Sequence, residues 1–178
     1  MGSPTGIELV NANVDLTRVF PGLAKTGYRK TSEADGTYNC IAWAAGRTDS
    51  FWWPHADAYW PPGVPLVLTV DAFVQAYEAV GYRTCADSIL ERGFEKVAIY
   101  ANAKLVPTHA ARQVPNGEWT SKLGLHIDIR HADPNALIGI DYGTPVRFMR
   151  RRLPIWRWVS FHVSSLVSKI VGKVRRAD

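Results

Sequence analysis

The residues best suited to carry out chemistry in this sequence are a cysteine, Cys40, and a histidine, His109. A cysteine thiolate is a strong nucleophile, and an imidazole within hydrogen-bonding reach can remove its proton and later return it. Cys40 precedes a run of strong helix formers that ends at Gly46, so we expect it in the first turn of a short helix. The unpaired amides at a helix N-terminus stabilise an anion, which favours ionisation of a thiol at this position.

A complete site of this kind also needs a group that orients the imidazole and donors for the oxyanion. The expected oxyanion donors are the backbone amide of Cys40 and the side chain of Asn39. His109 lies in a strand pattern followed by an Asn-Gly turn and a return strand, and the register across this hairpin offers three polar partners, Thr120, Ser121 and Lys122. Asp128 is the nearest carboxylate. The orienting group is therefore one of these three residues or Asp128, or the site is a dyad.

Four tryptophans are candidates for a substrate cleft. Trp52, Trp53 and Trp60 lie in a proline-rich segment, residues 51–63, and Trp119 lies in the return strand of the hairpin. Aromatic rings on a loop either bind a ligand or anchor the loop onto the core, and both alternatives stay open at this stage.

The predicted elements have an α+β order, with helices first and an antiparallel sheet after them. Apolar periodicity and stop signals predict the cysteine helix and a second helix from about residue 69 to Gly81. Strands are expected at residues 82–86, 95–101, 107–114, 118–123 and 143–149, and residues 133–135 resemble a helix start. Residues 1–36 are expected to form a mostly irregular leader with a short helix around residues 14–20, residues 37–150 the folded domain, and residues 151–178 a separate tail.

Composition is that of one ordinary globular domain of 178 residues. The two cysteines make no disulfide framework, and neither they nor the five histidines have metal-ligand spacing, so we expect neither a metal nor a cofactor. No secretory signal pattern and no apolar run of membrane-spanning length are found, which favours a cytoplasmic protein or delivery by a signal-independent route.

The positive charge is concentrated near the C-terminus. Residues 147–178 contain nine basic residues and one acidic residue, a net charge of +8, which leaves −3 for the other residues out of the total of +5. Apolar residues recur at helical spacing from Leu153 to Arg176, with basic residues at both ends, so the tail is expected to form an amphipathic helix. Such a helix binds an anionic membrane surface, binds a partner protein or packs on its own domain. Nucleic acid is a less suitable partner, because the bases alternate with aliphatic rather than stacking aromatic residues.

Three strings of residues, 38–44, 108–113 and 119–124, resemble papain-like cysteine peptidases and amidases. The resemblance is to the compact NlpC-type and CHAP-type branch, and most of all to an uncharacterised bacterial group within it, and it covers about residues 37–124. It implies a cysteine helix packed on an antiparallel sheet, with Cys40 as nucleophile and His109 as base. The third position departs from the family pattern, since NlpC-type enzymes commonly have His, Asn or Gln where this sequence has Ser121.

The resulting hypothesis is a bacterial cysteine-dependent hydrolase, a thiol protease or amidase, acting on an amide or related acyl bond of a peptide or protein substrate. The alternative is an inactive papain-like module that binds a protein or a membrane surface, as a peripheral membrane protein, through its basic tail.

Overall fold

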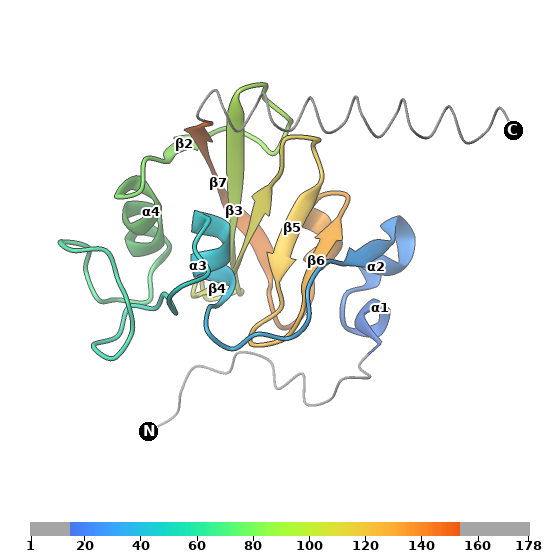
Figure 1. Ribbon diagram of the computed structural model, residues 1–178, viewed down its shortest axis with the longest axis horizontal. Helices are drawn as coiled ribbons and strands as arrows, with labels where there is room; N and C mark the ends of the chain where they lie inside the picture. Colours follow the sequence, from blue (N-terminus) through green and yellow to red (C-terminus); the bar gives the residue numbers. More distant parts are fainter. Residues whose placement is uncertain (1–14, 154–178) are drawn as a thin grey trace, which may run out of the picture.

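The computed structural model describes residues 15–153, which form an α+β fold around one antiparallel sheet of seven strands (Figure 1). The strand order is β1-β6-β5-β4-β3-β7-β2. The elements in chain order are α1 (Leu16–Val19), α2 (Pro21–Thr26), β1 (Tyr28–Lys30), α3 (Cys40–Ala45), α4 (Val70–Glu78), β2 (Arg83–Cys85), β3 (Phe94–Ala101), β4 (Pro107–Gln113), β5 (Trp119–Lys122), β6 (Asp128–His131), the 3-10 helix η1 (Pro134–Leu137) and β7 (Thr144–Arg152). Helices pack on both faces of this sheet.

Each face of the sheet is covered by its own apolar core. On the first face, α3 and α4 pack with the loop that carries the tryptophans against residues that include Val97, Ile99 and Ala110. On the second face, α1, α2 and η1 pack against residues that include Ala98 and Ala111. The alternation of neighbouring residues between the two cores follows the two-residue period of a strand. The face of a β4 residue therefore decides which helices its side chain meets.

The first residues of the described chain are not an irregular leader. Phe20 and Leu23 are buried in the second core, and β1 pairs with β6 at the edge of the sheet. Gly22 explains how closely α2 approaches η1, because a Cβ on this residue would lie 2.7 Å from backbone atoms of Ala136. Residues 15–30 therefore complete the fold. The short helix expected around residues 14–20 is found as α1, whereas α2 and β1 were not expected, because elements this short show no clear apolar period.

The expected hairpin and its neighbouring strands are found. Val114 and Glu118 close the turn through a backbone hydrogen bond, and Gly117 has a φ of 91°, which suits glycine. The strand β6 is an addition, since no strand was predicted over residues 128–131. The predicted helix start before Pro134 is confirmed as η1, with the Asp133 side chain accepting from the Asn135 amide at 2.7 Å.

Both edges of the sheet are short strands with basic side chains. β1 has three residues, all exposed, and includes Arg29 and Lys30. β2 also has three residues and begins with Arg83. Within residues 15–153, β1 pairs with β6 alone and β2 with β7 alone.

The last strand changes the division of charge between body and tail. Arg147 and residues 150–152 belong to β7, inside the sheet, and Arg150 and Arg151 form ion pairs with Glu91 and Glu95. Residues 154–178 then carry five basic residues and one acidic residue, a net charge of +4, so the preceding chain carries +1. The expected amphipathic helix lies outside the described residues. Among residues 15–153, no helix has the length and apolar character needed to cross a bilayer.

Candidate functional site

Cys40 begins α3, as its sequence context predicts, and its thiol is buried beneath the first face of the sheet. Burial raises the pKa of this thiol to about 11, since the thiolate would lose its hydration. Hydrogen bonds from the backbone amides of Ala110, Ile41 and Cys40 itself oppose this effect, as does the positive charge of Lys122. The sulfur therefore lies among donors that would stabilise negative charge, although a thiol with this pKa is neutral at pH 7.

Asn39 caps α3 and also binds the loop that carries the tryptophans. Its Oδ1 accepts from the amides of Ala42 at 3.1 Å and Trp52 at 3.2 Å, and its Nδ2 donates to the Trp52 carbonyl at 2.7 Å. Only one of the two Nδ2 hydrogens is used in holding the helix to the tryptophan loop, so the role of this side chain as an oxyanion donor stays a prediction. The amide of Cys40 remains available to that role.

His109 lies in β4 and is completely buried. Its ring stacks on Tyr142 with 3.9 Å between centroids and meets Tyr100 edge-on at 5.2 Å. Nε2 lies 3.2 Å from the Ser121 hydroxyl, whereas Nδ1 has no hydrogen-bond partner among the described residues. Burial holds the pKa of the imidazole well below 6.5, and the neighbouring His131 acts in the same direction. The expected contact with Ser121 is therefore present.

The structure does not join Cys40 and His109 by a hydrogen bond. Ala110 packs in the same core as Cys40, while His109 packs against Tyr100 and Tyr142 of the second core, so the thiol and the imidazole approach the sheet from opposite faces. The sequence pattern could not reveal this, because β4 has alanines on both faces and either face could have received a helix. The two residues nevertheless lie close together in space, since the thiol contacts the backbone amide of Ala110, the residue after His109.

The pairing of strands changes close to this point. The ladder between β4 and β5 consists of the pairs Arg112–Thr120 and Gln113–Trp119. Ala110 lies beyond these pairs, although it still pairs with Ile99 of β3, and its amide is among the groups that lower the pKa of the Cys40 thiol. The thiol thus lies beside the part of β4 that is paired with β3 but lies beyond the β4–β5 pairs.

His131 is a residue of this site that was not among the predicted site residues. It lies in β6, its Nε2 is 3.0 Å from the Ser121 hydroxyl, and its Nδ1 is 2.8 Å from the carbonyl oxygen of Asp133. Burial lowers its pKa to about 4. The alternation of Ile129 and His131 with polar neighbours is a strand signal, but four residues are too few to be distinctive.

Asp128 does not reach the imidazole. It lies on the first face, where its Oδ2 accepts from the Tyr38 hydroxyl at 2.8 Å and its Oδ1 is 3.9 Å from Nζ of Lys122. Lys122 is completely buried, donates to the carbonyl of His126 and lies over the Tyr38 ring. Asp128 therefore balances a buried lysine near Cys40 and is not the group that orients His109.

The four tryptophans do not line an open cleft. Trp52 and Trp60 are buried in the first core, Trp53 packs partly buried against it, and Trp119 is buried in the second core. Trp53 and Trp60 both meet Phe73 of α4 edge-on. The structure thus supports the alternative in which these rings anchor the loop onto the core. Burying a large aromatic ring away from water stabilises the fold.

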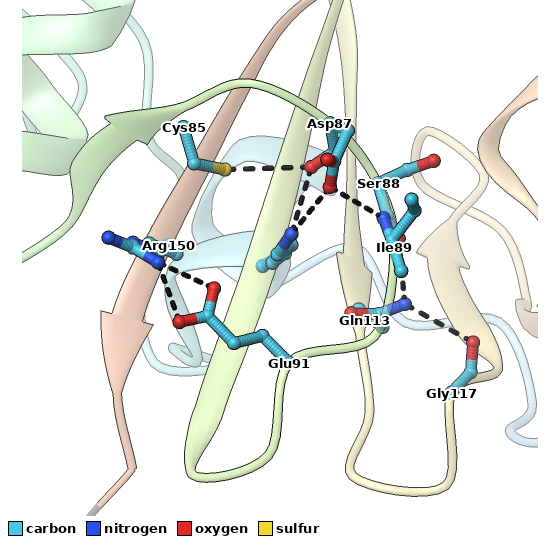
Figure 2. Close-up of polar contacts among 9 residues, drawn as sticks. Cys85, Asp87, Ser88, Ile89, Glu91, Gln113, Gly117 and Arg150 are labelled. Atoms are coloured by element: carbon cyan, nitrogen blue, oxygen red, sulfur yellow. Dashed lines mark hydrogen bonds and ion pairs between the residues drawn. The ribbon is translucent and has the colours of Figure 1, made fainter.

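Cys85 has no constellation of the same kind. It ends β2 half-buried, and its thiol contacts the Asp87 carbonyl at 3.6 Å (Figure 2). The loop after it is held by polar contacts. Asp87 pairs with the buried Lys96 at 2.9 Å, and Glu91 makes a bidentate ion pair with Arg150. Cys85 is therefore a useful internal reference for the reactivity of Cys40. Within residues 15–153, no cluster of three or more His, Cys, Asp or Glu residues is arranged to hold a metal ion.

Comparison with known proteins gives one match. The sequence model of a family described as a domain of unknown function (DUF7689) matches residues 29–150, the region from β1 into β7 that contains every residue of the candidate site. No curated protein and no solved structure matches the chain. Because the match covers well over half of the 178 residues, the chain belongs to the DUF7689 family.

Proposed function

We propose that the protein is a cysteine-dependent hydrolase that forms an acyl intermediate on Cys40. The observation that supports this most is the position of its sulfur among the backbone amides of Cys40, Ile41 and Ala110. Amide donors gathered at one point stabilise a thiolate, and they also stabilise an oxyanion formed beside it. A cysteine that only fills space in a core needs no such donors.

His109 is the proposed general base. It precedes Ala110 in β4, its Nδ1 has no partner, and its low pKa keeps the imidazole in the basic form at neutral pH. We propose that Cys40 and His109 meet past the last pair of the β4–β5 ladder when a substrate binds. The proposal includes a papain-like arrangement of the fold, in which a cysteine helix lies against an antiparallel sheet that carries the histidine.

The proposed reaction is hydrolysis of an amide or related acyl bond in a peptide or protein. Sγ of Cys40 attacks the carbonyl carbon, Nδ1 of His109 takes the thiol proton and delivers it to the leaving group, and water then releases the acyl group. Both partners are neutral beforehand, because burial raises the pKa of the thiol to about 11 and lowers that of the imidazole. The proton therefore moves during the attack, as it does for a serine nucleophile.

The test uses 4-nitrophenyl acetate, an activated ester, with mass spectrometry to locate the acetyl group. We expect acetylation of Cys40 to exceed that of Cys85, to be lost in Cys40→Ala and to fall at least about tenfold in His109→Ala, since a general base contributes this much or more. Cys85→Ala is the matched control and should leave the rate unchanged. Acetylation of Cys40 that is no faster than that of Cys85 would overturn the proposal.

A second candidate is a non-catalytic module that binds anionic membranes through its basic C-terminal segment. The missing bond between Cys40 and His109 in residues 15–153 favours it, as does the net charge of +4 in residues 154–178. Each basic residue near an anionic surface contributes about 1 kcal/mol, and salt weakens the attraction.

Flotation with vesicles that contain phosphatidylserine tests this candidate. The full chain should bind at low salt, and a variant with Gln in place of Lys169, Lys173, Arg175 and Arg176 should not. The matched control replaces four exposed basic residues of the folded body by Gln, namely Arg18, Lys25, Arg29 and Lys104. Equal binding by the two variants would rule out a specific role of the C-terminal segment.

A further inference from the structure

We infer that His131, acting through Ser121, is a positioning residue that holds the proton of His109 on Nε2 and leaves Nδ1 free. The inference deepens the proposed function and rests on it for its catalytic meaning. It concerns three buried side chains on three neighbouring strands, β4, β5 and β6. Their hydrogen bonds form one chain from His109 to Ser121, from Ser121 to His131, and from His131 to the Asp133 carbonyl.

The direction of every bond follows from the last member of the chain. A carbonyl oxygen can only accept, so Nδ1 of His131 must carry the hydrogen that it donates to Asp133 over 2.8 Å. The ring is neutral at neutral pH, since burial lowers its pKa to about 4. Nε2 of His131 is consequently without a hydrogen and can only accept.

Ser121 transmits this choice to His109. Its hydroxyl has a single hydrogen, and the bare Nε2 of His131 at 3.0 Å needs it. The hydroxyl oxygen can then only accept from Nε2 of His109, at 3.2 Å, so this nitrogen carries a hydrogen. The opposite arrangement would bring two lone pairs together in a buried place, which is costly. Because the His109 ring is neutral, its Nδ1 has a bare lone pair.

The surroundings keep the ring in this orientation. Tyr142 covers one side of His109 with an interplanar angle of 7°, and Tyr100 meets it edge-on. No hydrogen-bonding group of the described residues occupies Nδ1. His109 therefore already has the tautomer that can accept a proton at Nδ1 before a substrate binds. Fixing the tautomer and orientation of the base is what an orienting residue does in a nucleophile–base pair.

The experiment is nitrogen-15 NMR of histidine-labelled full-length protein at neutral pH, which shows which ring nitrogen carries the proton. We expect His109 to be protonated on Nε2 and His131 on Nδ1 in the wild type. Ser121→Thr keeps the hydroxyl and should retain both signals. Ser121→Ala removes it, so the Nε2 proton of His109 should become exposed to exchange and its signal should be lost or shifted.

The outcomes separate this inference from the proposed function. We call the hydrogen-bonded chain from His109 through Ser121 to His131 the relay. Three results would each overturn it: His109 protonated on Nδ1, His131 protonated on Nε2, or identical spectra of a folded Ser121→Ala and the wild type. With the relay intact, Ser121→Ala should also lower the acetylation rate of Cys40 about tenfold, with partial recovery in Ser121→Thr. If the spectra are as expected but Cys40 is not acetylated in the wild type, the relay stands and the hydrolase proposal fails.

Discussion

At the scale of single residues, the most unusual feature is the burial of two neutral imidazoles in one hydrogen-bonded chain. His109 and His131 both have a pKa below that of a histidine in water, mainly because burial disfavours the charged form. An unfolded chain would protonate the same residues near pH 6.5. The fold therefore gives up stability in mild acid, which natural proteins tolerate most readily at functional sites.

This cost predicts a pH-dependent stability. The unfolded chain binds protons more tightly than the folded one, so the free energy of unfolding is highest above about pH 6.5 and falls as the pH decreases toward about 4. For His131 alone the pKa difference corresponds to at most about 3 kcal/mol. Urea titrations at about pH 7 and about pH 5 should show a smaller loss in His131→Gln than in the wild type.

The matched control for this prediction is His55→Gln, at a histidine with an exposed side chain. It should retain the pH dependence of the wild type. If the wild type and His131→Gln lose the same free energy on acidification, His131 is not buried in its neutral form.

At the scale of elements, α3 depends on the tryptophan loop through one side chain. Asn39 caps the helix and also bonds both backbone groups of Trp52. Asn39→Ala should therefore cost more than an ordinary cap, about 3 kcal/mol, because two backbone groups of the loop lose their partner. Thr69→Ala removes only the cap of α4, a single bond of 3.3 Å, and should cost about 1 kcal/mol.

Denaturant unfolding of the two variants measures this difference. An equal loss of stability would mean that Asn39 acts as a cap and nothing more. The larger loss would show that the position of Cys40 depends on the loop, since the same side chain holds the start of its helix.

Elements with a local signal could be predicted from the sequence, and elements defined by long-range contacts could not. The caps of α3 and α4 and the glycine turn at residues 115–117 are local, and these elements are found where expected. The strands β1 and β6 have three and four residues. They are defined by long-range pairing, of β1 with β6 and of β6 with β5, which a local sequence pattern does not reveal. The contact of His109 with Ser121 followed from hairpin register, but the face of the sheet that α3 covers did not.

At the scale of the whole molecule, the N-terminal helices close the second core and so support the wall behind His109. Gly22→Ala tests this support, since the added Cβ would lie 2.7 Å from the backbone of Ala136. Alanine is more favourable than glycine in a helix by up to about 1 kcal/mol, but overpacking costs about 1–3 kcal/mol. We therefore expect Gly22→Ala to lower the free energy of unfolding. Gly36→Ala has no atom within 4 Å of its Cβ and should change stability by less than about 0.5 kcal/mol.

Thermal or urea unfolding of full-length variants provides the measurement. A neutral or stabilising Gly22→Ala would indicate that α2 moves away from η1 without loss, and hence that residues 15–30 contribute little to the fold.

The short basic edges of the sheet restrict how other proteins can bind. A long, flat edge invites a foreign strand to extend the sheet through backbone hydrogen bonds, and this is also a common beginning of aggregation. Here each edge has only three residues and carries Arg29, Lys30 or Arg83, so an added strand would gain few bonds and would meet positive charge. Strand addition is thereby disfavoured at both ends, and recognition of a partner is left to side chains and loops.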